Sequence, residues 1–499
     1  MKYGPSSLCA VIVTALVAGG AITTACSSDT PDPVGSSGSS GDAGGEGGGG
    51  IDLSTPSIAC ADSIDSIYGD PGPLTAENGS LLKCAKDADL TKDAMQTKLG
   101  AAGYTGKPLT SNARVYRVSY VTKRGNDAKT PAVSSASVFI PETPRADKLP
   151  VVIAARGSRG QAAKCAVSKL DPSQEGINQD AYRLVYPLVG LGYAVILTDL
   201  AGYANFNAPG NPPSAYAQAE DVAYSTLDSG KALKKLFPSL ESKVVLVGHS
   251  QGGHSALAAL ALSDGYPTAG PIVGAAVYAP LWLSQSSWAA VLYRPVGKDF
   301  PLGASAAGPV SVWYHYTHAE LLDGPGEGEK LFAADKRAAI KKFVEETCWE
   351  GKDEELKKLG SFADELFDPA FAPIVAYPSV SGDCGGNAIC DKWKARYSKD
   401  RPHLVGAAKS TPILLAYGGA DDTIPPSRMR CALDRLSEDA ANVTVCYEAD
   451  KGHGTILSSK ADYVSDWIAS VALGAQAPAA CPANASAITV ACAVPPPND

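Results

Sequence analysis

Apolar residues follow two different patterns along the chain beyond residue 51. In the segments Ala113–Lys123 and Ala132–Ile140, polar and apolar side chains alternate on either side of Gly125-Asn126-Asp127, which predicts an antiparallel hairpin. Later segments are short, uninterrupted apolar runs, which are typical of strands buried on both faces in a parallel sheet. These runs are Pro150–Ala155, Ala194–Thr198, Val244–Val247, Ile272–Tyr278 and Ile413–Tyr417.

Segments of helical character separate the apolar runs. This alternation predicts the α/β class, with a mostly parallel central sheet that begins with antiparallel strands. The connection from Pro280 to Ser410 is far longer than the dozen or so residues that a crossover needs. It contains the amphipathic stretch Leu331–Val344, so we expect an inserted, mainly helical cap at about residues 280–410. The helical segments are Gln179–Val189, Ala215–Leu236 and Gly252–Leu262.

The first fifty residues resemble an export signal followed by a tether. Lys2 precedes an uncharged, largely apolar run over residues 8–25, and small residues lead to Cys26, as in bacterial lipoprotein signals. We therefore expect a signal peptide at residues 1–25 and lipidation of Cys26; the alternative is a cleaved secretory signal without lipid. Residues 35–50 contain 13 Gly or Ser out of 16, which predicts a flexible linker over residues 26–50.

These signals predict an exported protein. Serine at position 27, directly after Cys26, resembles the signal that sorts such lipoproteins to the outer membrane. We therefore expect a location there or at the cell surface, and otherwise secretion. Beyond the N-terminus no apolar segment is long enough to span a bilayer, so membrane contact would come only through the lipid. The remaining chain predicts one folded domain at residues 51–474, followed by an Ala/Pro-rich tail at residues 475–499.

Charge and cysteine content narrow the function classes. The net charge of −9 without a basic cluster excludes a nucleic-acid-binding surface. Twelve cysteines less Cys9 and Cys26 leave ten, an even number that indicates disulfides in an exported chain. No Cys-x-x-Cys pair exists and the histidines lie apart from the cysteines, so we expect no metal site. Local spacing favours the pairs Cys60–Cys84, Cys384–Cys390, Cys431–Cys446 and Cys481–Cys492.

Two further cysteines remain after this local pairing. They are Cys165 and Cys348, which would form a long-range pair between the core and the cap. Sequence spacing alone leaves the connectivity open, and a local pairing of Cys165 with Cys60 or Cys84 is the alternative.

The sequence Gly248-His249-Ser250-Gln251-Gly252 joins an apolar strand to an Ala/Leu-rich helix. A serine on such a sharp strand-to-helix turn is exposed above the sheet, where it can act as a nucleophile. The start of the helix aims backbone amides at the oxyanion that the attack creates. We therefore expect Ser250 to be the nucleophile and the Gln251 amide to be one oxyanion donor.

A serine nucleophile needs a histidine base and an acid that orients it, in the chain order serine, acid, histidine. Asp421 and Asp422 follow the run that ends at Tyr417, and His453 lies between glycines just past another strand. The sequence Gly-x-x-Asp-x-x-x-Pro favours Asp421, and either aspartate could instead cap a turn. His254, on the helix after the nucleophile, and His315 and His318, in the cap, are interpreted as structural residues, although the cap pair could line a pocket.

The loop Arg156-Gly157-Ser158-Arg159-Gly160 follows another buried strand, where the second oxyanion donor belongs. The Ser158 amide is the best candidate for that donor. This loop and several other segments together resemble the secretory lipase family of α/β-hydrolases, to which fungal lipases of the A type belong. The other segments are the strand-to-helix turn around Ser250, Cys165-Ala166-Val167-Ser168, Gly192-Tyr193-Ala194-Val195, Asp199 and Gly202-Tyr203.

The resemblance covers about residues 90–475 and implies an α/β-hydrolase fold with a cap between nucleophile and acid. It implies catalytic roles for Ser250, Asp421 and His453, and it supports the Cys165–Cys348 bridge, because the family joins its oxyanion-loop cysteine to the cap. Arg156 departs from the family's usual histidine, which affects the expected oxyanion geometry and substrate preference.

Together these observations predict a serine carboxylic-ester hydrolase that forms an acyl-enzyme on a small-molecule or lipid ester, without a cofactor. The alternatives are a serine peptidase or amidase, an acyltransferase of the same fold, and a non-catalytic binding lipoprotein, since a fold alone does not define a function.

Overall fold

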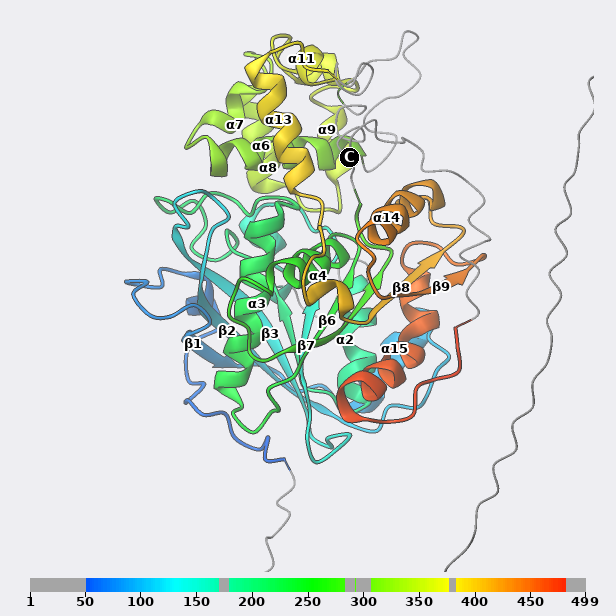
Figure 1. Ribbon diagram of the computed structural model, residues 1–499. Coiled ribbons are helices and arrows are strands. Elements are labelled where there is room, and N and C mark those ends of the chain that lie inside the picture. Colours follow the sequence, from blue (N-terminus) through cyan, green and yellow to red (C-terminus); the bar gives the residue numbers. More distant parts are fainter. Residues whose placement is uncertain (1–50, 170–178, 283–291, 293–306, 377–382, 482–499) are drawn as a thin grey trace, which may run out of the picture. The chain divides into compact units, whose positions relative to one another are not determined.

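The computed structural model describes residues 51–169, 179–282, 292, 307–376 and 383–481 (Figure 1). The fold below belongs to the compact unit that begins at Gly49. The expected signal peptide, the lipidated Cys26 and the Gly/Ser-rich linker lie outside the described residues, as does the end of the expected tail.

A nine-stranded sheet forms the centre of this unit, in the order β1-β2-β3-β5-β4-β6-β7-β8-β9. Strands β1, β2, β3 and β5 pair antiparallel, and all pairs from β5 through β9 are parallel. The strands are β1 (Leu81–Lys86), β2 (Ala113–Lys123), β3 (Pro131–Pro141), β4 (Val151–Ala155), β5 (Val195–Thr198), β6 (Val244–His249), β7 (Ile272–Tyr278), β8 (Ile413–Gly418) and β9 (Val443–Glu448).

The hydrophobic pattern explains these strands. Every residue of β4, β5, β6 and β8 is buried, because helices cover both faces of the parallel part, as the uninterrupted apolar runs predict. The predicted hairpin is continuous in register from the pair Ala113–Pro141 to the pair Lys123–Pro131. Several of its polar side chains are also buried: Thr122 donates a hydrogen bond to Asp228 at 2.7 Å, and Ser135 donates one to Asp199 at 2.7 Å.

Helices cover the two faces of the sheet. Helices α3 and α4 pack together on one face, and α2 packs with α15 and α1 on the other (Figure 1). Helix α3 begins at Ala219 rather than at the expected Ala215, because the Gln218 side chain caps it by accepting a hydrogen bond from the Asp221 amide at 2.6 Å. The helices outside the cap are α1 (Lys92–Ala101), α2 (Gln179–Gly190), α3 (Ala219–Leu236), α4 (Gln251–Leu262), α14 (Pro426–Glu438) and α15 (Thr455–Leu473).

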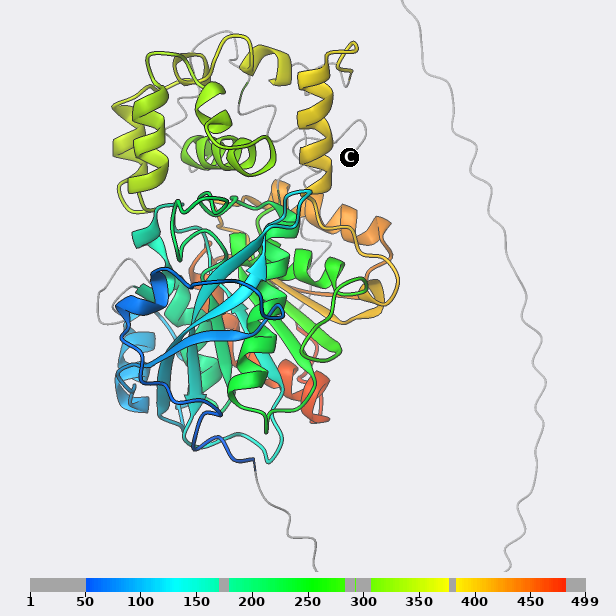
Figure 2. The ribbon, with the colours of Figure 1, turned by 90° about the vertical axis from the view of Figure 1, so that its left-hand side faces the viewer.

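The described residues between β7 and β8 form the expected helical cap, which lies beyond the ends of the parallel strands (Figure 2). In the expected helix Leu331–Val344 only the part from Arg337 onward is helical, because Phe332 instead bridges to Phe367. The cap helices are α6 (Ala307–Leu322), α7 (Glu327–Lys330), α8 (Arg337–Glu346), α9 (Lys352–Lys357), α10 (Ala363–Leu366), α11 (Ala372–Ala376) and α13 (Ala388–Lys399).

Three of the expected disulfides are present: Cys60–Cys84, Cys165–Cys348 and Cys384–Cys390. The expected pairs Cys431–Cys446 and Cys481–Cys492 are wrong, because Cys446 of β9 is bonded to Cys481.

The physical reason for this correction is the path of the chain after α15. The segment beyond α15 returns along that helix, where the Cys481 amide donates a hydrogen bond to Tyr463, and so reaches β9. Cys431 is itself disulfide-bonded, and Cys492 lies outside the described residues. Disulfides at this density indicate a protein exported to an oxidising compartment.

Among the described residues, no helix is both long enough and apolar enough to cross a bilayer.

Candidate active site

Ser250 occupies a strained turn between β6, which ends at His249, and α4, which begins at Gln251. Its backbone has φ 55° and ψ −122°. Residues other than glycine rarely adopt this conformation, so the surrounding structure must enforce it. The Ser250 amide donates to the Tyr278 carbonyl at 3.0 Å, and its carbonyl accepts from the Leu281 amide at 2.8 Å. This backbone geometry fits the predicted nucleophile elbow.

Close backbone contacts explain the glycines around this turn. A β-carbon on Gly252 would lie 2.0 Å from the Ala155 carbonyl oxygen, so only glycine lets α4 start against the end of β4. A β-carbon on Gly157 would lie 3.4 Å from the Ser250 β-carbon and 2.4 Å from an Asp180 carboxylate oxygen. The elbow and the loop after β4 therefore touch at Ser250.

Asp421 lies in the turn after β8, and its carboxylate is fully buried. Its Oδ1 accepts hydrogen bonds from the amides of Thr423 at 2.9 Å and Ile424 at 2.8 Å. Its Oδ2 lies 2.8 Å from His453 Nδ1. Asp422 is exposed, and its carboxylate accepts a hydrogen bond from the Thr423 hydroxyl at 3.3 Å. The geometry therefore pairs Asp421 with the histidine, and the same carboxylate also caps the turn.

His453 follows β9, and its loop is held by the histidine that precedes Ser250. His249 Nε2 donates to the His453 carbonyl at 3.0 Å, and the two rings lie 4.6 Å apart. Burial, and secondly the neighbouring His453, hold the pKa of His249 well below its usual range, so His249 is neutral. This contact brings the histidine loop next to the elbow. No hydrogen bond joins the Ser250 hydroxyl to the His453 ring in the described residues, and such contacts often tighten only when substrate binds.

The two expected oxyanion donors start from different elements. Gln251 is the first residue of α4, and Ser158 is on the loop after β4. No group in the described part of the chain accepts a hydrogen bond from either backbone amide. The Ser158 hydroxyl lies 2.6 Å from the Tyr216 hydroxyl, which ties the loop to the segment before α3. Both amides are therefore available to a bound group.

Asp180, in the first turn of α2, is a residue of this site that the sequence analysis missed. Its carboxylate accepts a hydrogen bond from the Gly157 amide at 3.0 Å, forms an ion pair with Arg159 and lies 3.5 Å from His249 Nδ1. The only available signal was an acid at the start of the helix predicted to follow the oxyanion loop. Asp180 therefore anchors the loop next to the elbow.

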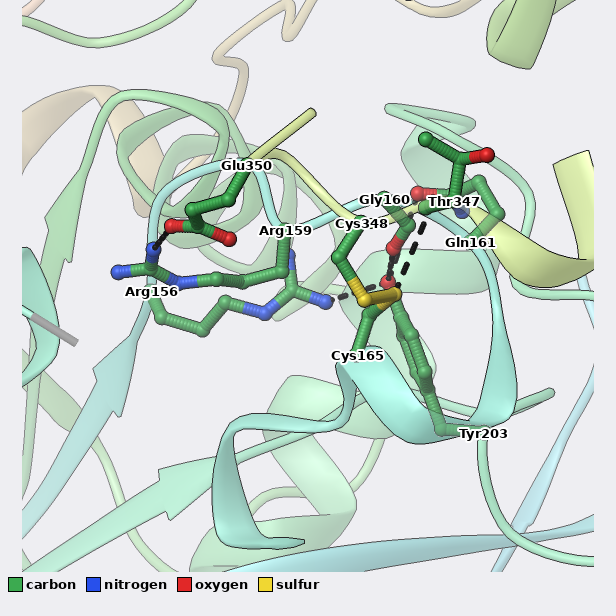
Figure 3. Close-up of a disulfide and its surroundings, with 9 residues drawn as sticks. All are labelled: Arg156, Arg159, Gly160, Gln161, Cys165, Tyr203, Thr347, Cys348 and Glu350. Atoms are coloured by element: carbon green, nitrogen blue, oxygen red, sulfur yellow. Dashed lines mark hydrogen bonds and ion pairs between the residues drawn. A yellow bond between two sulfur atoms is a disulfide. The ribbon is translucent and has the colours of Figure 1, made fainter. Parts of the chain in front are cut away.

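The cap attaches to the core at the oxyanion loop (Figure 3). The Cys165–Cys348 disulfide lies beside a backbone bridge between Gly160 and Cys348. The Trp349 amide donates to the Arg159 carbonyl at 2.8 Å, and Arg159 lies 3.5 Å from Glu350. The loop is thus fixed on one side by Asp180 and on the other by the cap.

Three further histidines, His254, His315 and His318, lie in packed interiors, whereas His403 is exposed. His254 donates to the Asp400 carbonyl at 2.6 Å, and burial lowers its pKa to about 4. His315 contacts the Tyr397 hydroxyl at 2.6 Å, and burial lowers its pKa to about 3. The His318 ring packs on Tyr314 with ring centres 3.7 Å apart. These contacts are structural, as interpreted from the sequence. Among the residues that the structure describes, no three His, Cys, Asp or Glu side chains are grouped to hold a metal ion.

The fold and this site together define the class: an α/β hydrolase with a serine elbow and an aspartate–histidine pair. The chain belongs to the alpha/beta hydrolase family, whose model matches residues 176–467. No curated protein matches the sequence.

Similar solved structures have the same fold at low sequence identity. The rice cell wall degrading esterase LipA from Xanthomonas oryzae has a TM-score of 0.57 at 19% identity, over 79% of this chain and 97% of its own. Lipase A of Candida antarctica, in its closed state, has a TM-score of 0.60 at 17% identity, over 88% of this chain and 91% of its own. At these identities the likeness concerns the fold.

Proposed function

We propose that this protein is a serine carboxylic-ester hydrolase, a lipase or esterase, in which Ser250 is the nucleophile. The observation that carries the proposal is the 2.8 Å contact between His453 Nδ1 and Asp421, on the loops beside a serine with positive φ. With Nδ1–H donated to Asp421, the Nε2 atom of His453 is left unprotonated and can act as a base.

In the acylation step, Ser250 Oγ attacks the carbonyl carbon of the ester and its proton passes to His453 Nε2. Asp421 stabilises the resulting imidazolium, and the Ser158 and Gln251 amides donate to the oxyanion. When the oxyanion collapses, the bond to the alkoxy oxygen breaks and His453 protonates the leaving alcohol. The acyl group remains on Ser250.

Deacylation repeats this sequence with water. His453 removes a proton from water, whose oxygen attacks the acyl carbon, and the same two amides hold the second oxyanion. Collapse breaks the bond to Ser250 Oγ, which recovers its proton from His453 as the carboxylic acid leaves. Every step uses side chains and backbone amides of this chain.

The substrate is a small-molecule or lipid ester. The names of the structural neighbours, an esterase and a lipase, support ester rather than amide hydrolysis. The location that fits the N-terminal sequence is the outer membrane or cell surface, with the enzyme attached through a lipid on Cys26.

Labelling and turnover of matched substrates test this proposal. A fluorophosphonate should label Ser250, and p-nitrophenyl esters from short to long acyl chains should be hydrolysed faster than the matched anilides. Ser250→Ala should lose the label and nearly all turnover, because only the oxyanion hole and binding then remain to catalyse the reaction. Its unfolding temperature should stay close to that of the parent.

Each alternative has its own outcome. Preference for the anilides would indicate an amidase, and ester product with an added acceptor alcohol would indicate acyl transfer. A folded protein with neither label nor turnover would indicate a binding lipoprotein. Near-parental hydrolysis by Ser250→Ala would exclude the proposed mechanism.

A further inference from the structure

Arg156, at the end of β4, is a charged residue buried beneath the oxyanion loop, with 2% of its surface exposed. One terminal nitrogen donates to the Gly157 carbonyl and to Gln251 Oε1, each at 3.0 Å. The other donates to the Tyr203 hydroxyl at 2.6 Å and to the Asp199 carbonyl at 3.4 Å. We propose that Arg156 is the positioning residue that orients both oxyanion donors, an inference that rests on the proposed ester hydrolysis.

The contact with Gly157 controls the direction of the Ser158 amide. The Gly157 carbonyl and the Ser158 N–H belong to one planar trans peptide unit, so they point in opposite directions. By holding the carbonyl, Arg156 holds the whole plane, and the Ser158 N–H must point away from the guanidinium. In the described residues this N–H has no acceptor, so it is available for the oxyanion.

The contact with Gln251 links the second donor to the first. The same guanidinium nitrogen that holds the Gly157 carbonyl holds Gln251 Oε1, on the first residue of α4. Among the described residues the buried Gln251 Nε2 atom has no hydrogen-bond partner, so within them the side chain is held through Oε1. One nitrogen therefore joins the loop that carries Ser158 to the first turn of α4, which carries Gln251.

Tyr203 in turn holds Arg156 in place (Figure 3). Its ring lies 5.1 Å from the guanidinium carbon, and its hydroxyl accepts from Arg156 and donates to the Gly160 carbonyl at 2.6 Å. Through this hydroxyl the guanidinium is coupled to the far end of the oxyanion loop, where the cap attaches.

The guanidinium group suits this role because of its shape. All four of its acceptors are neutral oxygens, and in the described residues no carboxylate oxygen lies within 4.0 Å of it. Arginine offers five N–H donors in a planar fork, whereas an imidazole has at most two and a lysine ammonium has no fixed plane. Four acceptors in these positions require the fork.

The test compares Arg156→Met and Arg156→Lys with the parent on one p-nitrophenyl ester. Misdirected oxyanion donors weaken binding of the transition state but not of the ground state, so kcat should fall while KM stays within about threefold. For Arg156→Met we expect a loss of about 10²- to 10³-fold, the usual effect of losing one oxyanion donor. Arg156→Lys keeps the charge without the fork and should recover only part of this loss.

Arg117→Met is the matched control. Arg117 is also buried, on β2, where it donates to Asp87 at 2.7 Å and to Ser137, away from the elbow. Its loss should lower the unfolding temperature and leave kcat of the folded protein unchanged. Parental kcat in a folded Arg156→Met, or full recovery in Arg156→Lys, would overturn the proposal.

A second variant covers the case in which Arg156→Met does not fold. Tyr203→Phe removes only the hydroxyl that holds Arg156, and we expect a roughly tenfold lower kcat with unchanged KM. Tyr193→Phe, which removes a buried hydroxyl bonded to the Ser465 carbonyl at 2.8 Å, is its control and should keep parental kcat. Parental kcat in Tyr203→Phe would then overturn the role of Arg156. A parent that hydrolyses no ester would overturn the proposed function itself, and this inference with it.

Discussion

At the scale of single residues, the Asp421 carboxylate divides its two oxygens between two tasks. One oxygen accepts two backbone amides of its own turn, and the other faces His453. The turn therefore fixes the carboxylate before any substrate arrives. An exposed neighbour, Asp422, offers the same chemistry without this fixation.

We therefore expect Asp421→Asn to cost far more activity than Asp422→Asn. An amide facing His453 can hold the ring in the tautomer that lacks a free base, which costs on the order of 10⁴-fold in kcat in serine proteases. The exposed Asp422→Asn should change kcat by less than about twofold, as surface substitutions usually do. Steady-state kinetics of the two variants decides the matter, and a reversed order would transfer the role to Asp422.

A second prediction at this scale concerns pH. Burial lowers the pKa of His254 to about 4 from its ordinary value near 6.5. As the pH falls, the His254 ring is therefore protonated at a higher pH in the unfolded chain than in the folded protein. The contribution of His254 to stability is therefore complete above pH 6.5 and is lost as the pH falls toward 4, by about 3 kcal/mol.

His254→Gln keeps a donor toward the Asp400 carbonyl but does not titrate. Relative to the parent it should gain stability between pH 7 and pH 4, which urea unfolding at several pH values measures. Burial raises the pKa of Asp400 to about 7, so its protonation stabilises the fold over the same pH range. Because both proteins contain Asp400, the difference in stability between variant and parent isolates the effect of His254. A constant difference between the two proteins would show that His254 does not titrate as described.

At the scale of elements, the sequence predicts best what depends on neighbours in the chain. The apolar runs define β4 to β8, and the elbow around Ser250 needs only a strand, a short motif and a helix. The pairing of Cys446 with Cys481 depends on how the chain turns back after α15, which no local pattern encodes. The roles of Asp180 and Tyr203 depend likewise on contacts between separate elements.

The attachment of the cap gives the prediction at this scale. The Cys165–Cys348 bridge, with a sequence separation of 183, should stabilise the fold by up to about 5 kcal/mol in the chain-entropy model. Because it borders the oxyanion loop, replacing both cysteines by serine should also lower kcat by about 10- to 100-fold.

The matched control is the double serine variant of Cys384 and Cys390, a bridge within the cap with a sequence separation of only 6. It should keep parental kcat. Thermal unfolding and ester kinetics of both variants measure the two effects. Equal activity of the two variants would mean that the bridge to the core does not support the active site.

At the scale of the whole molecule, the folded unit extends beyond the last long helix. Helix α15 ends at Leu473 and is capped by Gly474; Cys481 is seven residues past Gly474 and is bonded to the edge strand β9. We expect Cys481→Ser to be less stable than the parent by up to about 4 kcal/mol, from the lost bridge of sequence separation 35. Urea unfolding measures this loss, and an unchanged unfolding midpoint would contradict it.

The bridge between Cys165 and Cys348 joins two segments that are synthesised at different times. A chain is made from its N-terminus at about 5–20 residues per second, so Cys348 follows Cys165 by roughly 10–40 s. The bond itself forms only in an oxidising compartment. The disulfide that joins the cap to the loop carrying Ser158 therefore forms only after the cap has been synthesised and exported. With the expected dependence of kcat on this bridge, about 10- to 100-fold, the proposed enzyme would reach its full activity only after export.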